Sequence, residues 1–319
     1  MIKTTVVGNY PKVADGLSKG SIRSTIHQVD SGKLSAGELE EVFRENTRRV
    51  LKEQEAVGIE LLTDGQLRWD DLVTPFASKI EGFQINGLTR FFNNNVYYRQ
   101  PIVVAALRYR GPISVEQFRL AKQETRKELK AVLPGPFTFA ALSEDKFYQD
   151  EHKLVMTLAE ILNQEAQALE KAGCAFIQFD EPALVFNKEK IALVLEGIGR
   201  VRKGLRAKVA LTTYFGDVSE ILEDVLDAPV DVVGLDFVSS DGNLKVLKHK
   251  PIQKGLGVGC VDARNTKLED SSALRDLLKR LQRLTPELYV SPNAGLEFLP
   301  YSSVAKKLKG MVKAAQALT

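Results

Sequence analysis

The 319-residue sequence has only two cysteines and three histidines, and it has no long hydrophobic run. Cys174 and Cys260 lie far apart without ligand spacing, so they predict neither a disulfide nor a structural zinc site, and both are expected in the core. No apolar run approaches the roughly 18 residues that cross a bilayer. The first residues lead into an apolar strand pattern instead of a signal peptide. We therefore expect a cytosolic protein with no membrane partner.

An excess of charge of one sign is also absent. The chain has 44 basic and 41 acidic residues and a net charge of +3, which is too nearly balanced to predict a nucleic-acid partner. An apolar content of 44% with 27% charged residues is typical of a globular protein with an ample core. A chain of this length can form one large domain or two ordinary ones.

Short apolar runs alternate with helical patterns along most of the chain. The helical stripes lie within residues 38–56, 115–131, 154–169, 217–226, 274–284 and 304–315. The expected strands are residues 4–8, 59–63, 131–136, 175–180, 208–214, 231–236, 255–261 and 288–293. Eight strands in this order predict an α/β protein, a single (β/α)8 TIM barrel over residues 1–319. A doubly wound open sheet is the alternative, but no glycine-rich phosphate loop follows the first strand.

Residues 83–111 do not fit this alternation. Two β-rich stretches, 91–98 and 102–107, are separated by Arg99, Gln100 and Pro101, which predicts a β-hairpin excursion. Such a hairpin could cover one end of the fold as a flap. A surface ornament without a part in the chemistry is the other interpretation.

Polar residues follow most of the expected strands, where α/β proteins place their chemistry. Asp180 and Glu181 are the candidate general acid or base, and Arg264 is a candidate clamp for an anionic substrate. Each residue alone is also compatible with a cap or a turn. Crowded carboxylates raise one another's pKa, so we expect Arg68, Arg264, a metal or an ammonium-bearing ligand beside them. The candidate substrate-binding residues are Asn9, Asp64, Gln66, Arg68, Tyr214, Asp236, Asp262 and Asn293.

Metal-ligating residues are scarce near these strand ends. His27, His152 and His249 fall in expected loops or helices, and Cys260 is the one thiol near a strand end, so structural zinc is not predicted. A hard-cation site made of Asp180, Asp236 and Asp262 is conceivable, but these residues have no diagnostic spacing.

Several stretches together resemble the cobalamin-independent methionine synthases, whose chain is similar to a duplicated barrel. Residues 177–184, with the sequence IQFDEPAL, match a motif of both halves of those enzymes. Four further stretches resemble the amino-terminal half: 91–98 (FFNNNVYY), 133–138 (LPGPFT), 211–215 (LTTYF) and 262–265 (DARN). The resemblance covers nearly the whole chain, and it implies a TIM barrel and a methyltransferase related to methionine biosynthesis.

The resemblance also implies which residues serve the site. In the catalytic half of the family, a zinc ion that activates the homocysteine thiolate is held on the fifth, sixth and eighth strands, and the matching positions here are Leu211, Thr213, Asp236 and Ala294. Only Asp236 could readily ligate a metal, so the resemblance implies no zinc site in this chain. The family holds the homocysteine amino group with an aspartate that matches Asp180 and a glutamate that matches Gln66.

Two further departures concern charge and stacking. Because Gln66 is neutral, the amine pocket loses one of its two negative charges. The tryptophan that stacks on folate in the catalytic half appears as Leu142, which weakens a folate interpretation.

Three hypotheses stay open from the sequence. The first is methyl transfer to a thiol such as homocysteine, with folate or a corrinoid protein as the methyl source and with a separate zinc-bearing barrel as a possible partner. The second is an independent, metal-free enzyme of different chemistry that uses the carboxylates at the strand ends. The third is a non-catalytic binding barrel.

Overall fold

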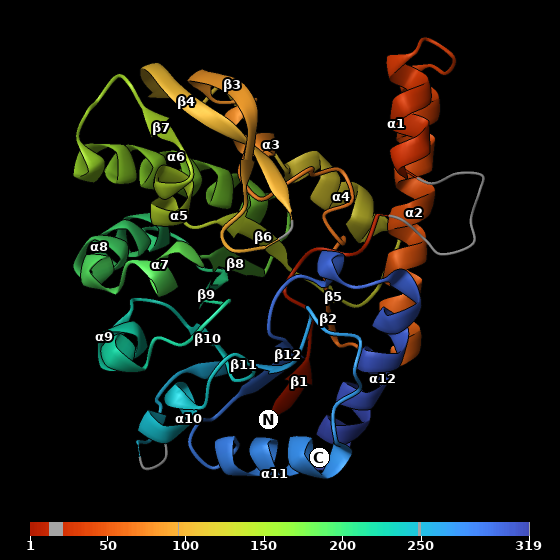
Figure 1. Cartoon of the computed structure of the whole chain (residues 1–319), viewed down its shortest axis with the longest axis vertical. Helices are drawn as coiled ribbons and strands as arrows, with labels where there is room; N and C mark the ends of the chain where they lie inside the picture. The colour runs from red at the N-terminus through yellow and green to blue at the C-terminus, as the bar shows by residue number, and fades with distance from the viewer. Residues whose placement is uncertain (13–21, 95, 248–249, 319) are drawn as a thin grey trace. The chain divides into compact units, whose positions relative to one another are not determined.

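The computed structural model describes residues 1–12, 22–94, 96–247 and 250–318 (Figure 1). Seven parallel strands form one sheet in the order β1-β12-β11-β10-β9-β8-β6. Their bounds are β1 Ile2–Thr4, β6 Ala131–Pro134, β8 Phe176–Asp180, β9 Lys208–Thr212, β10 Val232–Asp236, β11 Gly255–Val261 and β12 Leu288–Pro292. The predicted α/β class with parallel strands is confirmed.

The predicted second strand is shorter than expected and lies outside this sheet. β2 (Leu61–Leu62) pairs in parallel with β5 (Glu128–Leu129), and an isolated bridge joins Thr5 to Leu61. A closed eight-stranded barrel therefore stays a prediction.

The chain divides into two compact units, so the single domain also stays a prediction. Unit 1 comprises Met1–Arg68, Gln117–Lys130 and Leu235–Thr319, and unit 2 comprises Trp69–Glu116 and Ala131–Gly234. Strand β10 contributes residues to both units.

In unit 1 the long helices have clear start and stop signals. α2 (Ala36–Val57) begins with a capping box, in which the Ser35 hydroxyl accepts from the Glu38 N–H and the Glu38 carboxylate accepts from the Ser35 N–H. It ends at Gly58, whose φ of 93° lies in the left-handed region. The other helices assigned to this unit are α1 (Ile22–Asp30), α10 (Gly242–Leu247), α11 (Ser271–Leu281), α12 (Tyr301–Gln316) and the 3-10 turn η3 (Leu296–Phe298).

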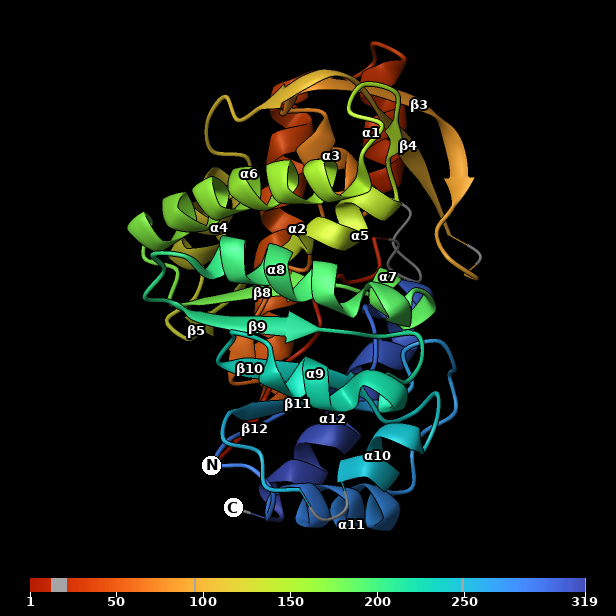
Figure 2. The ribbon, with the colours of Figure 1, turned by 90° about the vertical axis from the view of Figure 1, so that its left-hand side faces the viewer.

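In unit 2 an amphipathic helix covers the sheet. α6 (Glu151–Lys171) is capped by Asp150, and its buried stripe includes Leu158 and Leu162. Figure 2 shows α6 and α8 (Ile191–Arg202) side by side along β8 and β9. The remaining helices here are α3 (Thr74–Ala77), α5 (Pro136–Ala141), α7 (Ala183–Phe186), η1 (Lys188–Lys190), η2 (Ser219–Ile221) and α9 (Leu222–Asp227).

The segment predicted as a hairpin contains two antiparallel strands with different bounds. β3 (Glu81–Arg90) pairs with β4 (Tyr97–Arg108), and the two-residue strand β7 (Glu144–Asp145) adds to β4 in parallel. Of the expected first arm, 91–98, residues 91–94 and 96 lie between the two strands and residues 97–98 begin β4. Phe92 adopts a positive φ of 51°, and the Phe91 N–H bonds to the Val96 carbonyl.

Two expected helices also differ in extent. The pattern over 115–131 ends as α4 (Val115–Gln123), and Lys130 then donates its N–H to the Leu62 carbonyl beside β5. Asp217 accepts from the Ser219 N–H and so begins the 3-10 turn η2 before α9. His249 lies outside the described residues.

No helix in the part of the chain that the structure describes has both the length and the apolarity needed to span a membrane.

A buried carboxylate on α6 fixes the segment that follows the hairpin. Glu165 is 0% exposed and accepts the N–H groups of Ile113 and Ser114 at 2.8 and 2.7 Å. The hydroxyls of Tyr109 and Ser114 donate to it at 2.7 Å each. Its side chain therefore satisfies two backbone donors that would otherwise be buried without partners.

We expect Glu165→Ala to lower the free energy of unfolding by about 3–5 kcal/mol, because it leaves buried backbone and hydroxyl donors unpaired. Glu160→Ala is the matched control on the same helix, since Glu160 pairs with Arg200 at the surface and should contribute less than about 1 kcal/mol. Urea unfolding of both variants checks this. Equal losses for the two substitutions would contradict the assigned role.

Candidate active site

Asp180 is the centre of a buried hydrogen-bonded group in unit 2. All five residues of β8 are buried, and Asp180 at its end is 3% exposed. The Gln178 amide donates to Oδ1 of Asp180 at 2.7 Å, because residues two apart on a strand share a face. The Tyr214 hydroxyl donates to Oδ2 at 3.2 Å. These two neutral donors hold the carboxylate in one orientation at the end of β8.

Strand register explains why Tyr214 reaches Asp180. Asp180 is opposite Pro134 on β6 and Thr212 on β9, so the three strands end at the same level. The loops that follow these strands are therefore neighbours, as parallel strands require. The structure thus brings together Asp180, Glu181 and Tyr214 from the predicted set.

An aromatic group adjoins Tyr214. The Phe215 ring lies 4.7 Å from that of Tyr214 and 5.8 Å from that of Phe92, at the turn of the hairpin. Phe92 also stacks on Phe186, with centroids 5.3 Å apart. Phe215 has a φ of 76°, and such conformations in residues other than glycine cluster at functional sites. The hairpin turn therefore packs beside the residue that binds Asp180.

Glu181 occupies a different kind of position. Its oxygens accept the N–H groups of Phe137 and Thr138 at 3.0 and 2.7 Å, at the start of α5. Gly135 permits this approach, because a Cβ there would overlap the Glu181 carboxylate. Burial raises the pKa of Glu181 to about 7, although its hydrogen bonds to Thr138 and Phe137 act in the opposite direction. Both oxygens are thus committed to the backbone of α5.

Asp236 is likewise surrounded by donors, in unit 1. It is 0% exposed, and its Oδ1 accepts from the N–H groups of Val238 and Ser239 at 2.8 and 3.0 Å. The Ser239 hydroxyl donates to Oδ2 at 2.6 Å, and the Asn293 amide lies 3.2 Å from both oxygens. This network ties the end of β10 to the end of β12 and satisfies a buried charge.

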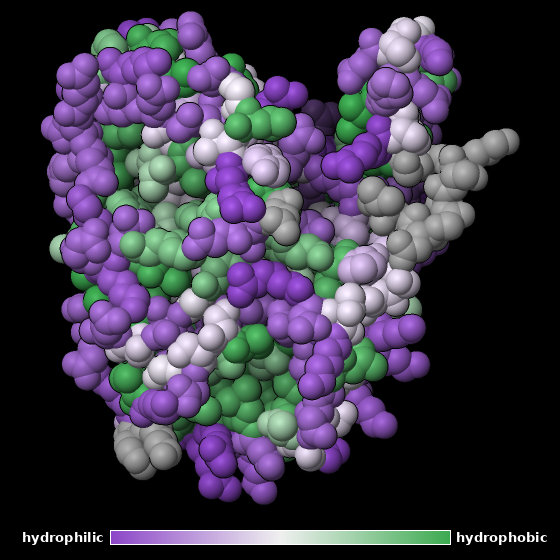
Figure 3. All heavy atoms as spheres, viewed as in Figure 1, coloured by the Kyte–Doolittle hydropathy of each residue, from purple (hydrophilic) through white to green (hydrophobic). Residues whose placement is uncertain are grey.

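Arg264 and Asp262 follow β11 at the edge of this network. Arg264 is exposed and donates to the Ser239 hydroxyl at 3.3 Å, while Asp262 accepts the Arg264 N–H. Asp262 also lines a groove beside α11 with Cys260 and Leu274. Figure 3 shows an apolar hollow with a hydrophilic rim over this part of unit 1. Arg264 and Asp236 are therefore connected through one serine.

A third group in unit 1 contains Asn9 and Gln66. The Asn9 amide donates to Oε1 of Glu297 at 2.9 Å. Gln66 is 4% exposed, has a φ of 50°, and its amide lies against Gly8, where a Cβ would be 2.8 Å from Oε1 of Gln66. Gln66 therefore lies beside Gly8, and Glu297 is hydrogen-bonded to the next residue, Asn9.

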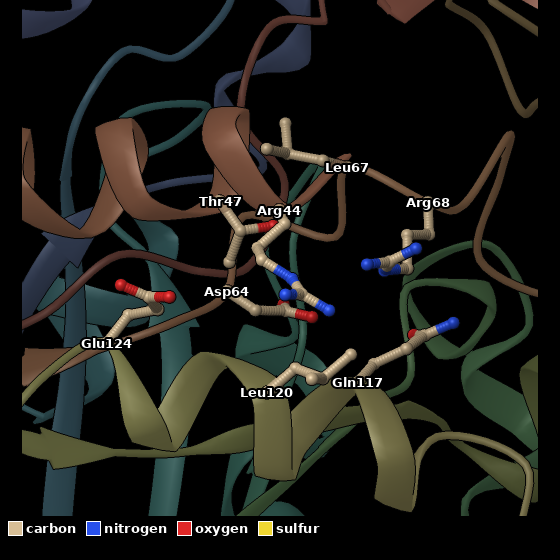
Figure 4. Close-up of a pocket in the computed structure, with 8 residues that line it drawn as sticks. All are labelled: Arg44, Thr47, Asp64, Leu67, Arg68, Gln117, Leu120 and Glu124. Atoms are coloured by element: carbon tan, nitrogen blue, oxygen red, sulfur yellow. The ribbon is translucent and has the colours of Figure 1, made fainter. Parts of the chain in front are cut away.

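Asp64 and Arg68 line a separate small pocket between α2, α4 and the loop after β2 (Figure 4). Arg68 pairs with Glu40 at 2.5 and 2.6 Å, and its guanidinium lies 4.8 Å from the centre of the Phe43 ring. Asp64 accepts the Gln66 N–H at 2.9 Å, and burial raises its pKa. Arg44 and Asp64 both point into this pocket, whose remaining lining residues are Thr47, Leu67, Gln117, Leu120 and Glu124.

The sequence-predicted residues therefore form local groups within each unit, and one shared opening for all of them stays a prediction. Gln178 and Glu297 are among the residues of these groups that were not predicted. Gln178 had a signal, because it is a polar residue inside an apolar strand. Glu297 had none, because it lies five residues beyond the last strand, in the short 3-10 turn η3, and belongs to no motif.

The residues present do not fit the zinc ion of the family. Leu211 and Ala294 are buried and have no donor atoms, and the Thr213 hydroxyl donates to the Gly234 carbonyl at 3.2 Å. Asp236 already binds protein donors through both oxygens. In residues 1–12, 22–94, 96–247 and 250–318, no three or more His, Cys, Asp or Glu side chains are grouped so that they could hold a metal ion.

The comparisons with known proteins agree on one family. Residues 2–317 match the family model described as "Cobalamin-independent synthase, Catalytic domain". The methionine synthase of Saccharolobus solfataricus is 33% identical and is aligned over 100% of this chain and 95% of its own length. The methionine synthase of Pyrococcus furiosus is 31% identical, over 100% of this chain and 93% of its own.

Solved structures share the fold. A B12-independent methionine synthase from Shewanella sp. W3-18-1, in complex with selenomethionine, superposes with a TM-score of 0.84 at 25% identity, over 99% of this chain and 97% of its own. A methyltransferase from Methanosarcina mazei has a TM-score of 0.65 at 14% identity, over 98% of this chain and 94% of its own, and this likeness concerns the fold alone.

The matching family model describes the catalytic domain, whereas most of the motifs in the sequence resembled the amino-terminal half. The motif resemblance to the family as a whole is confirmed. With a full-length family match and relatives more than 30% identical, the chain belongs to the cobalamin-independent methionine synthase family, which makes it a methyltransferase.

Proposed function

We propose that this chain takes part in the transfer of a methyl group to a thiol such as that of homocysteine. The observation that carries the proposal is the family match over residues 2–317, together with relatives named methionine synthase. The selenomethionine bound to the Shewanella protein supports an amino acid with a methylated chalcogen as the product. A location in the cytosol stays a prediction.

Asp180 is the residue that we assign to the substrate amino group. The resemblance gives its counterpart this role, and its charge is oriented by Gln178 and Tyr214, which donate at 2.7 and 3.2 Å. A carboxylate held in one orientation can form a charge-assisted hydrogen bond with an ammonium. Phe215 and Phe92 then form the aromatic side of the site in unit 2.

The thiol has to become a thiolate before it can accept a methyl group. Because the zinc-ligand positions hold Leu211, Thr213, Asp236 and Ala294, we propose that activation depends on a separate zinc-bearing barrel of the family. A corrinoid protein is the alternative partner, as the source of the methyl group. No catalytic step is assigned to a metal bound by this chain.

A second candidate function is metal-independent chemistry at the same carboxylates. The absence of zinc-ligating side chains at Leu211, Thr213 and Ala294 favours this function, because chemistry that does not involve a metal does not require such ligands. Activity that survives exhaustive chelation and that requires Asp180 would distinguish this function from the first.

Glu181 is assigned a positioning role and not a catalytic one. Its two oxygens accept amide hydrogens at the start of α5, so a proton transfer would have to break these contacts. The carboxylate instead holds α5 next to the end of β8, where Asp180 lies.

We expect Asp180→Asn to lower kcat/KM for methyl transfer to homocysteine by about 30- to 150-fold, because a charge-assisted hydrogen bond to the substrate is lost. The assay follows methionine formation from methyl-folate and from a methyl-corrinoid donor, with and without zinc and a zinc-bearing barrel of the family. Asp241→Asn is the matched control, since Asp241 is exposed and pairs only with Lys245 at 2.8 Å among the contacts described. No turnover and no partner binding in any combination would contradict the proposed function.

We expect Glu181→Gln to retain more than about a tenth of the activity, because one oxygen still accepts an amide hydrogen. Since burial raises the pKa of Glu181 from 4.5 to about 7, the wild type should lose stability relative to this variant as the pH rises from 4.5 to 7. Thermal unfolding across this range measures the difference. An inactive but fully folded Glu181→Gln protein would instead assign Glu181 to the chemistry.

Gly135→Ala tests the same position through the backbone. The added Cβ would overlap Glu181, so we expect a loss of about 1–3 kcal/mol of stability. Gly310→Ala is the control, because no atom lies within 4 Å of its Cβ position in α12 and alanine favours the helix. A Gly135→Ala variant that is as stable as the wild type would contradict the close approach of Glu181 to Gly135.

A further inference from the structure

A groove in unit 1 lies apart from the residues that we assign to methyl transfer. It is formed by the end of β11, the segment that joins β11 to α11, and the first half of α11, with Val238 after β10 (Figure 3). All of its lining residues belong to unit 1, and Asp180 and Tyr214 are not among them. Its volume is about 700 Å³. Small-molecule sites have volumes of about 300–1,000 Å³, so the groove is large enough for an organic ligand.

The inner wall of the groove is apolar. Leu274 and Cys260 are buried there, and Val238 and Leu277 are half-buried beside them. Burial and the charge of Glu269 raise the pKa of the Cys260 thiol to about 12, so this group is uncharged at neutral pH. The wall therefore suits the apolar part of a ligand, which loses water when it binds.

A buried lysine fixes the segment that forms one side of the groove. Lys307 of α12 is 1% exposed, and its ammonium donates to Oε1 of Glu269 and to the Lys267 carbonyl at 2.6 Å each. The same oxygen of Glu269 accepts the Asp262 N–H at 3.0 Å. Leu268, which lies between these contacts and lines the groove, is 55% exposed. The groove is therefore formed in advance, with a large apolar side chain held at its edge.

The rim of the groove carries more negative than positive charge. Asp262, Glu269 and Asp270 line it, and Lys267 is the one cationic residue among the described residues of the lining. The Ser272 hydroxyl donates to Asp270 and lowers its pKa, so this carboxylate is ionised at neutral pH. Even if Glu269 is neutralised by the buried lysine, the two aspartates exceed Lys267 by one charge. The rim therefore favours a cation.

We propose that this groove binds a small organic cation, whose apolar body lies against Cys260 and Leu274 and whose ammonium lies at the rim beside Asp262. An ammonium there can form a charge-assisted hydrogen bond with a carboxylate, while the body is removed from water. The inference goes beyond the proposed function and does not depend on it, because no residue assigned to methyl transfer lines the groove.

The test uses three fluorescent probes that share one dansyl body and differ in charge. Dansylcadaverine carries an ammonium, its N-acetyl derivative is neutral, and dansyl-6-aminohexanoate carries a carboxylate. We expect the ammonium probe to bind with a Kd below about 0.5 mM, and the neutral probe to bind about fivefold or more weakly. The carboxylate probe should be the weakest, and added salt should reduce these differences.

Substitutions in the groove separate its shape from its charge. Ala273→Trp places a large ring in the groove from an exposed position of α11, and we expect it to weaken the ammonium and neutral probes by about tenfold or more. Ala56→Trp is the matched control, since Ala56 is exposed on α2 and does not line the groove. Asp262→Asn should weaken the ammonium probe by about threefold or more and leave the neutral probe unchanged. Lys267→Glu should strengthen binding of the ammonium probe.

Thermal unfolding shows whether each variant is folded. The inference is overturned if the folded wild type binds none of the probes, if the three probes bind with equal affinity, or if a folded Ala273→Trp protein binds them as the wild type does. Equal weakening by Ala56→Trp would also overturn it, because binding would then lie elsewhere. If Ala273→Trp does not fold, Asp262→Asn and Lys267→Glu still decide, since unchanged binding of the ammonium probe to both refutes the site.

Discussion

Asp180, Glu181 and Asp236 lie inside the protein, where an ionised carboxylate is stable only if hydrogen-bond donors converge on it. The structure meets this requirement at the carboxyl ends of parallel strands, since the register brings the following loops together. Backbone amides of α5 donate hydrogen bonds to Glu181. The loop after β10 and the Asn293 amide donate hydrogen bonds to Asp236. Glu165 holds the segment after the hairpin by the same means. Hydrogen bonds from nearby loops to buried carboxylates therefore fix the position of these loops in the candidate site.

The way in which each carboxylate is satisfied indicates what it can do. Glu181 and Asp236 have both oxygens bound by protein donors, so their role is to fix loops. Asp180 is held by two neutral side chains, and Glu297 has one oxygen without a donor in the described residues. A carboxylate that is held in one orientation can form a charge-assisted hydrogen bond with a cationic ligand.

Much of the fold follows from the sequence, and the site follows only in part. The periodicity over 154–169 and the apolar runs at 176–180 and 255–261 predicted elements that the structure contains, because burial imposes these patterns directly. The bounds of β3 and β4 did not follow, since the reversal at Phe92 depends on packing against Phe186 and Phe215, which are distant in sequence.

The roles of single residues were harder to predict. Strand ends identify Asp180 and Asp236, but the sequence does not show which amides and hydroxyls reach them. Glu297 belongs to no motif, and its hydrogen bond with Asn9, 288 residues earlier, is not visible in the sequence. The zinc-ligand positions came from the family resemblance, and two of them hold leucine and alanine, which cannot ligate a metal.

A structure of the protein with bound L-methionine tests this account most directly. The account predicts the ligand ammonium within hydrogen-bond distance of the Asp180 carboxylate, with Glu181 still accepting the amides of Phe137 and Thr138 and Asp236 still bound to Ser239. A ligand whose ammonium makes no contact with Asp180, or displaces the protein donors of Glu181 or Asp236, would contradict it.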